Sequence, residues 1–284
     1  MKTVLVTGAT GFVGRHVIEC LQKTSLHVVA TASSAENMKG KEWLRNVTTI
    51  PHKIGEEKEG ENLFEKFLRP DVVIHLAWQG LPNYRSLFHF EEVLPQQYFF
   101  LKNLVQNGAK NITVTGTCFE YGMQQGELTE DMASLPDNPY ALAKNTLRLF
   151  LEQLQKQYSF SFKWTRLFYM YGQGQNPKSL LAQLDVALAN GEEVFNMSGG
   201  EQVRDYLPVE QVAANIVSIA LQDKIEGLIN CCSGTGIKVK ELVQQHIQKK
   251  QQPIKLNLGF YPYPDYEPMQ FWGSNNKLKS ILEK

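Results

Sequence analysis

The segment NPYALAKNTL, residues 138–147, places a tyrosine and a lysine one helical turn apart. Asn138 is a favourable helix N-cap, and Pro139 suits a first turn because its missing N–H has no intrahelical partner there. Tyr140 and Lys144 would then share one face of the helix. A free phenol has a pKa of about 10, and a neighbouring positive charge lowers it toward working pH. The pair could therefore donate a proton to a substrate oxygen.

The same spacing occurs a second time in YFFLK, where Tyr98 and Lys102 lie in an apolar stretch. We assign this copy to the core or to a dimer contact. Tyr140 instead lies downstream of an apolar run, NITVTGT, that ends at Thr117. Strands of a parallel sheet present ligand-binding residues at their carboxyl ends. The alternative, in which Tyr140 is a packed aromatic ring and Lys144 a solvated surface residue, is less consistent with this context.

Short apolar runs alternate with helical patterns up to about residue 168. Six of these runs are typical of strands: KTVLVTG, HVVAT, VTTI, DVVIHLA, NITVTGT and FKWTRLF. Strands that alternate with helices pair in parallel, so the fold class is α/β, a Rossmann-like doubly wound parallel sheet. We expect a dinucleotide-binding domain over residues 1–167, to which 203–232 return. Residues 168–202 and 233–284 would form a smaller C-terminal substrate-binding lobe.

The segment TGATGFVG places Gly8, Gly11 and Gly14 between the first strand and the first helix. Glycine permits a tight turn and lets the backbone approach a pyrophosphate, whose charge is stabilised at the helix N-terminus. Three glycines alone are a weak signal. Here a strand precedes them and a helix follows, which is the context that favours dinucleotide binding over a structural turn.

Composition limits the other classes of function. The 284 residues carry 29 basic and 29 acidic side chains, which gives no electrostatic footprint for nucleic acid. No apolar run is long enough for a membrane span, and the N-terminus lacks the pattern of a signal peptide. The four cysteines show neither a metal-ligand spacing nor a disulfide framework. We expect a soluble cytoplasmic protein without a metal site.

Several motifs together resemble the extended short-chain dehydrogenases/reductases, in particular the nucleotide-sugar 4-ketoreductases and 4-epimerases. They are, in the order of that family, TGATGFVG, HLAW, VTGTCFEYG, PYALAK, RLFYMYG, VRDYLPVEQVA and GLINCCSG. The resemblance implies that Thr117, Tyr140 and Lys144 are catalytic. Tyr140 would protonate a carbonyl oxygen as hydride arrives at carbon, Thr117 would hydrogen-bond that oxygen, and Lys144 would hold the cofactor ribose.

The resemblance also implies two binding sets. The cofactor set comprises Gly8, Thr10, Gly11, Phe12, Val13, Gly14, Arg15, Ser33, Ser34, Lys53, Leu76, Ala77, Tyr140 and Lys144. The substrate set comprises Trp78, Tyr84, Cys118, Tyr169 and Arg204. In the family, an arginine at the place of Arg204 grips a nucleotide diphosphate; the alternative is an ion pair with Asp205 or Glu201. Trp78 could equally cover the sugar or pack in the core.

The end of the second strand bears on which dinucleotide binds. An acid there would bind the ribose hydroxyls of NAD and repel a 2′-phosphate, but the sequence reads Thr31, Ala32, Ser33, Ser34. Serine hydroxyls can donate to phosphate, so we expect NADP (NADPH) as cofactor, with NAD as the alternative. The family's adenine-contacting aspartate is also missing, and PHKIG offers His52 or Lys53 at that place.

The residues beside Thr117 bear on the reaction. Related dehydratases carry an Asp-Glu pair there, whereas this chain has Cys118 and Phe119. We therefore expect NAD(P)H-dependent reduction of the 4-keto group of a nucleotide-linked deoxysugar, as in the synthesis of surface polysaccharide precursors such as lipopolysaccharide. The alternatives are a 4-epimerase with tightly bound NAD and a non-catalytic dinucleotide sensor.

A homodimer is expected from two apolar-striped helices, residues 94–107 and 140–157. The aromatic tail from Phe260 is assigned to packing of the small lobe.

Overall fold

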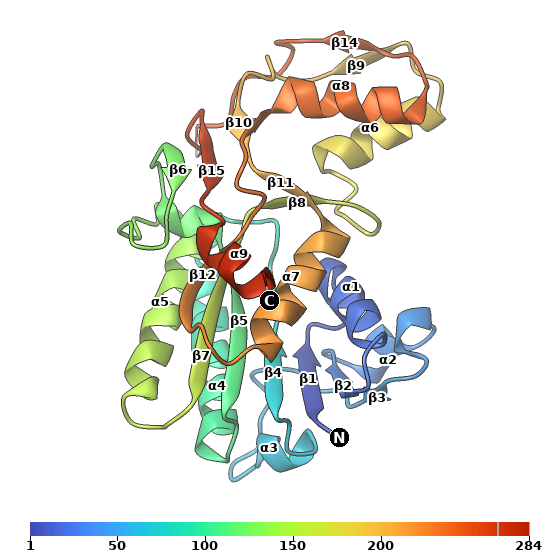
Figure 1. The fold of residues 1–284 in the computed structure, drawn as a ribbon. Coiled ribbons are helices and arrows are strands. Elements are labelled where there is room, and N and C mark those ends of the chain that lie inside the picture. The colour runs from blue at the N-terminus through green and yellow to red at the C-terminus, as the bar shows by residue number, and fades with distance from the viewer. Residues whose placement is uncertain (266, 284) are drawn as a thin grey trace.

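A seven-stranded parallel sheet forms the centre of the molecule in the computed structural model, which describes residues 1–265 and 267–283 (Figure 1). Its strands are β1 (Thr3–Thr7), β2 (His27–Thr31), β3 (Thr48–Thr49), β4 (Val72–His75), β5 (Asn111–Thr117), β7 (Ser161–Leu167) and β12 (Gly227–Cys231). Their spatial order is β12-β7-β5-β4-β1-β2-β3. The order reverses between β1 and β4, the place where doubly wound folds bind ligands. The predicted fold class is confirmed.

Helices cover both faces of this sheet because its buried strands are apolar on both sides. One face carries α1 (Phe12–Leu21) and α7 (Val209–Leu221), which pack on β1 through Val4 and Val6. The other face carries α4 (Leu94–Gln106) and α5 (Pro139–Gln155), which pack on β1 through Leu5. The short helices α2 (Ala35–Met38) and α3 (Leu63–Lys66) follow β2 and β3, and a π-helical turn, His89–Val93, precedes α4.

The small lobe lies above the carboxyl end of the sheet in Figure 1 and has its own apolar core. Its two helices, α6 (Leu180–Ala189) and α8 (Val239–Lys250), pack together there. Short paired strands complete the chain: β6 (Gly126–Leu128) with β15 (Phe271–Gly273), β8 (Tyr169–Tyr171) with β11 (Tyr206–Pro208), β9 (Val194–Asn196) with β14 (Lys255–Asn257), and β10 (Val203–Arg204) with β13 (Ile237–Lys238). Helix α9 (Asn276–Leu282) follows β15 and packs against α7.

The six expected strands correspond to β1, β2, β3, β4, β5 and β7. The strand pattern of GLINC, which we did not include among them, forms the seventh strand, β12, beside β7. The interpretation of the aromatic tail was wrong in part: the side chains of Phe260 and Tyr261 are 56% and 52% exposed, whereas Phe271 is buried. Among the described residues, no helix is long and apolar enough to cross a membrane.

Candidate active site

A cavity of about 450 Å³ opens at the carboxyl ends of β1, β5 and β7, where the strand order reverses. Its lining combines glycine-loop residues, ends of strands and aromatic side chains. These are Gly8, Gly11, Phe12, Val13, Gly14, Leu76, Trp78, Leu81, Pro82, Tyr84, Thr115, Gly116, Thr117, Cys118, Phe119, Tyr140, Lys144, Leu167, Phe168, Tyr169, Met170 and Asn176. The cavity therefore brings together the three expected catalytic residues and most of the expected binding residues.

The glycine loop forms one wall of this cavity and leads into α1. Gly8 has a φ of +68°, and a Cβ there would lie 2.9 Å from the backbone nitrogen of Ala77. A Cβ on Gly14 would lie 2.1 Å from the carbonyl oxygen of Gly8, so both positions require glycine. The N-cap of α1, Gly11, offers no side-chain cap. An uncapped helix N-terminus beside a cavity fits the pyrophosphate of a dinucleotide.

A second cavity, of about 240 Å³, shares Gly8, Gly11, Leu76 and Trp78 with the first. It is also lined by Thr7, Thr10, Thr31, Ala32, Ser33, His52, Ile54, Ala77, Gln79 and Gln97. The two cavities thus meet at the glycine loop. This arrangement suits an elongated ligand whose diphosphate lies at the loop and whose ends extend to either side, as a dinucleotide requires.

The polar groups expected near the adenosine half are largely engaged with the protein itself. The Ser34 hydroxyl caps α2 by accepting from Asn37 N–H at 3.2 Å, and Ser33 Oγ accepts from the Asn37 side chain at 2.7 Å. The ring nitrogens of His52 contact Glu57 Oε1 and Lys66 Nζ, each at 3.0 Å. His52 therefore lines the second cavity without a ring nitrogen to spare for adenine.

Four expected binding residues lie outside the lining of both cavities in the described part of the chain. Ser34 is one of them. Arg15 donates to Glu19 at 2.8 Å and to Gln173, and lies over the ring of Trp43. Lys53 is exposed and paired with Glu56 at 2.5 Å. The fourth is Arg204.

Arg204 is buried and fully engaged. Its Nε and Nη2 donate to Glu267 Oε2 at 3.2 and 2.9 Å, and its Nη1 donates to the carbonyl oxygens of Val203 and Met269. The partner is thus Glu267, not Asp205 or Glu201 as the alternative interpretation assumed. Asp205 accepts from the backbone N–H groups of Ser233 and Gly234, and Glu201 pairs with lysines of the small lobe.

Thr117, Tyr140 and Lys144 meet on the floor of the first cavity. Asn138 accepts from Ala141 N–H and caps α5, so that Tyr140 and Lys144 project from its first two turns toward the end of β5. Lys144 Nζ donates to the carbonyl oxygen of Thr115 at 2.8 Å. The Thr117 hydroxyl oxygen accepts from Phe119 N–H at 3.3 Å, so its proton remains available to another oxygen.

Burial sets the protonation of this group. Burial lowers the pKa of Lys144 to about 7, although the Glu120 carboxylate acts in the opposite direction. Burial also raises the pKa of Tyr140 well above its ordinary value; Tyr84, Glu120 and Cys118 add to the rise, and a hydrogen bond with Thr117 opposes it. We expected a lowered pKa for Tyr140. In the protein without ligand, desolvation of the phenolate outweighs the effect of a cation, so the phenol is protonated.

Aromatic rings surround Tyr140. Its centroid lies 6.0 Å from that of Trp78, 5.5 Å from Tyr84 and 5.3 Å from His89. Lys144 Nζ lies 4.1 Å from the centroid of Trp78, whose Nε1 donates to His89 Nδ1. Trp78 is half-buried: it packs against the apolar core on the α4 and α5 side of the sheet and lines both cavities beside the expected catalytic pair.

Glu120 and its partner Arg166 are polar residues of the site that our sequence analysis missed. Both side chains are fully buried; Arg166 Nε donates to Glu120 Oε2 at 2.8 Å, and Glu120 Oε1 accepts from Thr117 N–H at 2.8 Å. The spacing Thr-x-x-Glu in TCFE is a capping-box pattern and could have indicated this role of Glu120. The pairing of Arg204 with Glu267 has no comparable local signal, since 63 residues separate the two.

Comparison with known proteins agrees with this geometry. The sequence profile described as the NAD dependent epimerase/dehydratase family matches residues 4–232. The chain is 27% identical to a dTDP-6-deoxy-L-talose 4-dehydrogenase (NAD(+)) of Aggregatibacter actinomycetemcomitans over 95% of its own length and 99% of the relative. It is 25% identical to a UDP-glucose 4-epimerase of Halalkalibacterium halodurans, with 98% of this chain and 89% of the relative covered.

Among solved structures, a UDP-glucose 4-epimerase of Thermotoga maritima with UDP-glucose superposes with a TM-score of 0.82. The identity is 23%, and the alignment covers 98% of this chain and 91% of that one. At this identity the likeness shows the fold. The profile match extends over most of the chain, from the first strand to the end of β12, and includes every residue that we place on the cavity floor. The chain belongs to the NAD dependent epimerase/dehydratase family.

Proposed function

We propose that the protein reduces the 4-keto group of a nucleotide-linked 6-deoxy sugar with a nicotinamide dinucleotide. The observation that carries this proposal is the buried group of Thr117, Tyr140 and Lys144 on a cavity floor that the glycine loop adjoins. The two residues after Thr117 are Cys118 and Phe119. Neither is an acid or base suited to eliminating water, so hydride exchange at a carbonyl is the chemistry that the site supports.

In this mechanism the protein handles the proton. Tyr140, which burial keeps protonated, donates its proton to the carbonyl oxygen, and Thr117 donates a hydrogen bond to the same oxygen. The reduced nicotinamide, when bound, supplies the hydride that forms the new C–H bond and is thereby oxidised. The carbonyl becomes an alcohol, and the Tyr140 phenolate regains a proton from solvent. A positive charge on Lys144 would stabilise that phenolate while it exists.

The substrate side supports a deoxysugar. The rings of Tyr84, Phe119 and Tyr169 line the cavity close to Tyr140, with Tyr84 and Phe119 in edge contact at 5.2 Å. The apolar faces of these rings can pack on the methyl group of a 6-deoxy sugar. The relative with 27% identity is named for oxidation at C4 of a dTDP-6-deoxy sugar, and the reverse of such a reaction is reduction of the 4-keto sugar.

Arg204 remains our proposed contact for the nucleotide diphosphate. A guanidinium fork suits that anion, but two of its donors are directed to Glu267 here. Binding of a diphosphate at Arg204 therefore requires these donors to be released from Glu267 or shared with it. Tyr169, which stands where the family has an asparagine, lies beside Arg204, with its ring centroid 5.9 Å from the guanidinium carbon.

For the dinucleotide we propose NADP, because no carboxylate follows β2 before Glu36, so none at the strand end repels a 2′-phosphate. Ala32 and Ser33 line the second cavity at this point, and Ser33 Oγ accepts a hydrogen bond and so keeps its own proton to donate. The name of the relative with 27% identity specifies NAD(+). Efficiency with both reduced dinucleotides must therefore be compared.

A 4-epimerase is the second candidate, and the full-length match to a UDP-glucose 4-epimerase favours it. The two candidates differ in stoichiometry. Purified protein is incubated with NADPH or NADH and a panel of dTDP-, GDP- and UDP-linked 4-keto sugars, and absorbance at the nicotinamide band is followed. Loss of one dinucleotide per product supports the reductase. In a separate incubation with UDP-glucose, conversion to its 4-epimer without net dinucleotide oxidation would contradict the reductase and support the epimerase.

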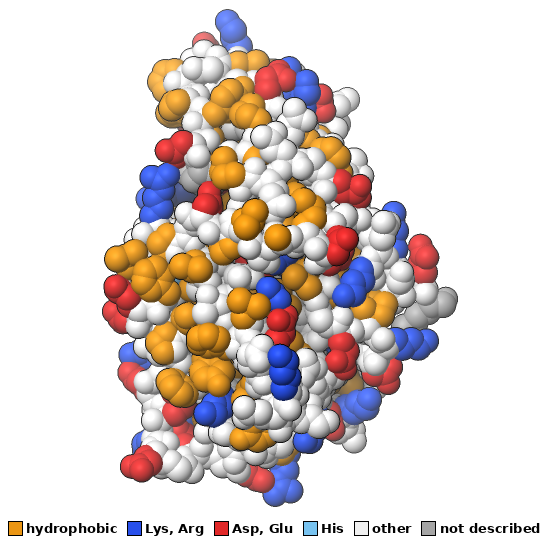
Figure 2. Space-filling model, turned by 90° about the vertical axis from the view of Figure 1, so that its left-hand side faces the viewer, with side chains coloured by type: hydrophobic (Ala, Val, Ile, Leu, Met, Phe, Trp, Pro, Cys, Tyr) orange, Lys and Arg blue, Asp and Glu red, His pale blue; other side chains and the backbone are white. Residues whose placement is uncertain are grey.

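We also propose a homodimer through α4 and α5. These helices expose four large apolar side chains, Phe99, Leu142, Leu149 and Phe150. Figure 2 looks onto the side of the molecule where α5 lies in Figure 1 and shows hydrophobic side chains gathered there. Tyr98 contacts Phe150 across the two helices, with ring centroids 5.3 Å apart, so the second tyrosine-lysine copy belongs to this surface.

A further inference from the structure

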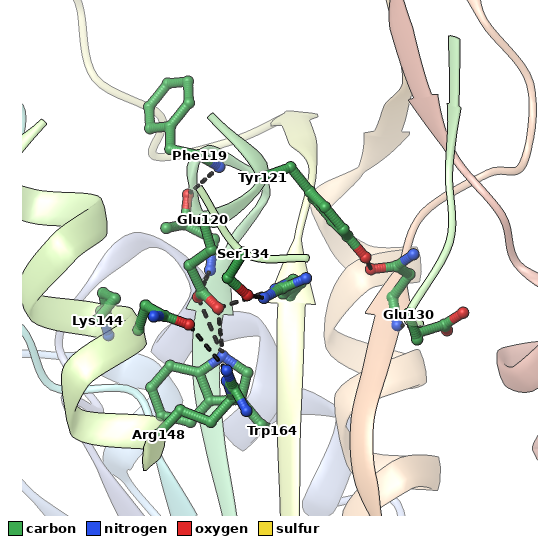
Figure 3. A network of polar contacts seen from close by, with 12 residues as sticks. Phe119, Glu120, Tyr121, Glu130, Ser134, Lys144, Arg148 and Trp164 are labelled. Carbon is green, nitrogen blue, oxygen red and sulfur yellow. Dashed lines mark hydrogen bonds and ion pairs between the residues drawn. The ribbon is translucent and has the colours of Figure 1, made fainter. Parts of the chain in front are cut away.

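The carboxylate of Glu120 is buried directly behind the end of β5 and accepts hydrogen bonds from three different groups. Its Oε1 accepts from Thr117 N–H at 2.8 Å, and Trp164 Nε1 lies 3.0 Å from each oxygen. Arg166 Nε donates to Oε2 at 2.8 Å. In Figure 3 the Glu120 side chain points away from Phe119 and toward Trp164. Every partner of the carboxylate is a donor, so each contact is charge-assisted.

Arg166 balances this charge without solvent. Its side chain is fully buried, its Nη2 donates to Ser134 Oγ, and its guanidinium carbon lies 4.1 Å from the ring centroid of Tyr121. Tyr121 in turn donates to Asn230 Oδ1 at 2.8 Å. The pair therefore ties β5, β7 and β12 together at their carboxyl ends. A fully enclosed charge pair of this kind is costly to desolvate and is weak evidence for stability alone.

The geometry at Thr117 suggests another use for the pair. Thr117 is the last residue of β5 and the N-cap of a 3-10 turn, Cys118–Tyr121, in which Glu120 closes a capping box. The box fixes the Thr117 N–H through Glu120 and the Thr117 hydroxyl oxygen through Phe119 N–H. The main chain and the side chain of Thr117 are thus held from two sides, and its hydroxyl makes a further hydrogen bond with the Tyr140 phenol in the cavity.

We propose that Glu120, held by Arg166, is a positioning residue that fixes the Thr117 hydroxyl for the reaction at the carbonyl oxygen. This inference rests on the proposed function. A misplacement of about 1 Å in a group that contacts the reacting atoms can cost about 100-fold in rate. The loss would appear in kcat, whereas KM and dinucleotide affinity would change little, because Glu120 lines neither cavity in the described part of the chain.

The charge of Glu120 also acts on both titrating residues of the site. It raises the pKa of Tyr140 and opposes the lowering at Lys144. Other groups face the same pair: Tyr84 and Cys118 face Tyr140, while Lys144 lowers the pKa of His75 and His89. These groups are unchanged in the variants below. Removal of the carboxylate should therefore move the alkaline limb of the reduction profile, which reports Tyr140, to lower pH.

Two double variants separate positioning from stability because neither leaves a buried charge unpaired. In Glu120→Gln/Arg166→Gln, the amide oxygen at position 120 still accepts from Thr117 N–H. The amide nitrogen at position 120 can donate to the amide oxygen at position 166. Glu120→Leu/Arg166→Met removes the acceptor and replaces the pair by apolar groups, a change that buried pairs often tolerate. Tyr121→Phe is the control, since it breaks the hydroxyl's bonds to Asn230 and Arg166 in the same buried network but keeps the Glu120 carboxylate that accepts from Thr117 N–H.

For each variant we would measure kcat and KM for the keto sugar and the pH profile of kcat. The dissociation constant for NADPH and the melting temperature are measured alongside. We expect kcat of the Leu/Met variant to fall about 10- to 100-fold with KM and NADPH affinity within a few fold, and that of the Gln/Gln variant to lie well above it. Tyr121→Phe should lower the melting temperature with little effect on kcat. Equal kcat in the Leu/Met variant and the wild type would overturn the proposal.

Two further experiments address a Leu/Met variant that does not fold and a wild type that reduces no keto sugar. If the Leu/Met variant does not melt cooperatively, Glu120→Met/Arg166→Leu replaces it: this variant also removes the acceptor for Thr117 N–H and leaves no buried charge unpaired, and the same loss of kcat against Tyr121→Phe is expected. If the wild type reduces none of the keto sugars, the proposed function fails, and amide hydrogen exchange of residues 115–121 tests the positioning on its own. Faster exchange in the Leu/Met variant supports the proposal, and unchanged exchange refutes it.

Discussion

Removal of the Tyr140 hydroxyl should abolish most of the turnover while leaving the fold intact. The ring of Tyr140 packs between Trp78, Tyr84 and His89, and phenylalanine preserves all of these contacts. The lost hydroxyl contributes one hydrogen bond, with Thr117, worth about 1 kcal/mol of unfolding free energy. Loss of a positioned general acid costs about 10²- to 10⁴-fold in rate, or about 3–5 kcal/mol of activation free energy. The effect on catalysis should therefore exceed the effect on stability.

Tyr98→Phe is the matched control, because it makes the same chemical change in the second tyrosine-lysine copy. Tyr98 packs against Phe99 and Phe150 on the helix surface, and Lys102 lies over its ring. Its turnover should stay within a few fold of the wild type. For both variants, kcat for the keto sugar, the dissociation constant for NADPH and the melting temperature are compared. NADPH affinity should be retained in Tyr140→Phe, since the glycine loop, not the phenol, adjoins the expected diphosphate site.

Two results would refute this assignment. Near-normal turnover of Tyr140→Phe would show that the proton comes from another group. An inactive Tyr98→Phe that still folds and binds the dinucleotide would mean that the catalytic role belongs to the other copy.

Three further predictions follow from single residues. Ala32→Asp places a carboxylate in the second cavity and should shift the preference from NADPH to NADH through like-charge repulsion; a wild type that already prefers NADH would disprove the argument from β2. Phe150→Glu should convert the dimer into a monomer by light scattering, whereas Val186→Glu, at an exposed apolar position of α6, should not. Because burial lowers the pKa of Lys144 to about 7 in the folded protein from 10.5 for an ordinary lysine, the unfolded chain binds the additional proton between these values, so stability should rise with pH across that window. Lys144→Met should reduce this rise in chemical denaturation, and an unchanged slope would contradict the burial argument.

The fold and the meeting of Thr117, Tyr140 and Lys144 in one cavity were predictable because their signals are local. The glycine spacing, the capping of α5 by Asn138 and the position of Thr117 at a strand end each depend on a few neighbouring residues. A parallel sheet then brings the ends of distant strands to one edge without further information. These general rules of topology suffice to place Tyr140, Lys144 and Thr117 on a common floor.

The polar pairings could not be predicted in the same way. Arg204 with Glu267, Arg85 with Asp265 and Arg166 with Glu120 each join segments separated by 46 to 180 residues. The first two pairs depend on how the C-terminal segment returns across the sheet edge, and the third depends on the pairing of β5 with β7. Surface and buried ion pairs also have the same appearance in a sequence. The prediction of a lowered pKa for Tyr140 was wrong for a related reason. The spacing of Tyr140 and Lys144 indicates a neighbouring cation, but it does not indicate how deeply the phenol is buried.

Burial explains both unusual properties of the catalytic pair. It is the largest cause of the raised pKa at Tyr140 and of the lowered pKa at Lys144, so a single apolar environment drives both side chains toward their neutral forms. A neutral phenol can donate its proton at once, and the phenolate that remains is an anion in a low-dielectric site. That anion would favour the protonated form of Lys144. With a pKa of about 7, Lys144 is close to half protonated at neutral pH before the phenolate forms. In the proposed reduction, the neutral phenol would be the proton donor to the carbonyl oxygen, and the Lys144 ammonium would be most stable at the stage when the phenolate exists.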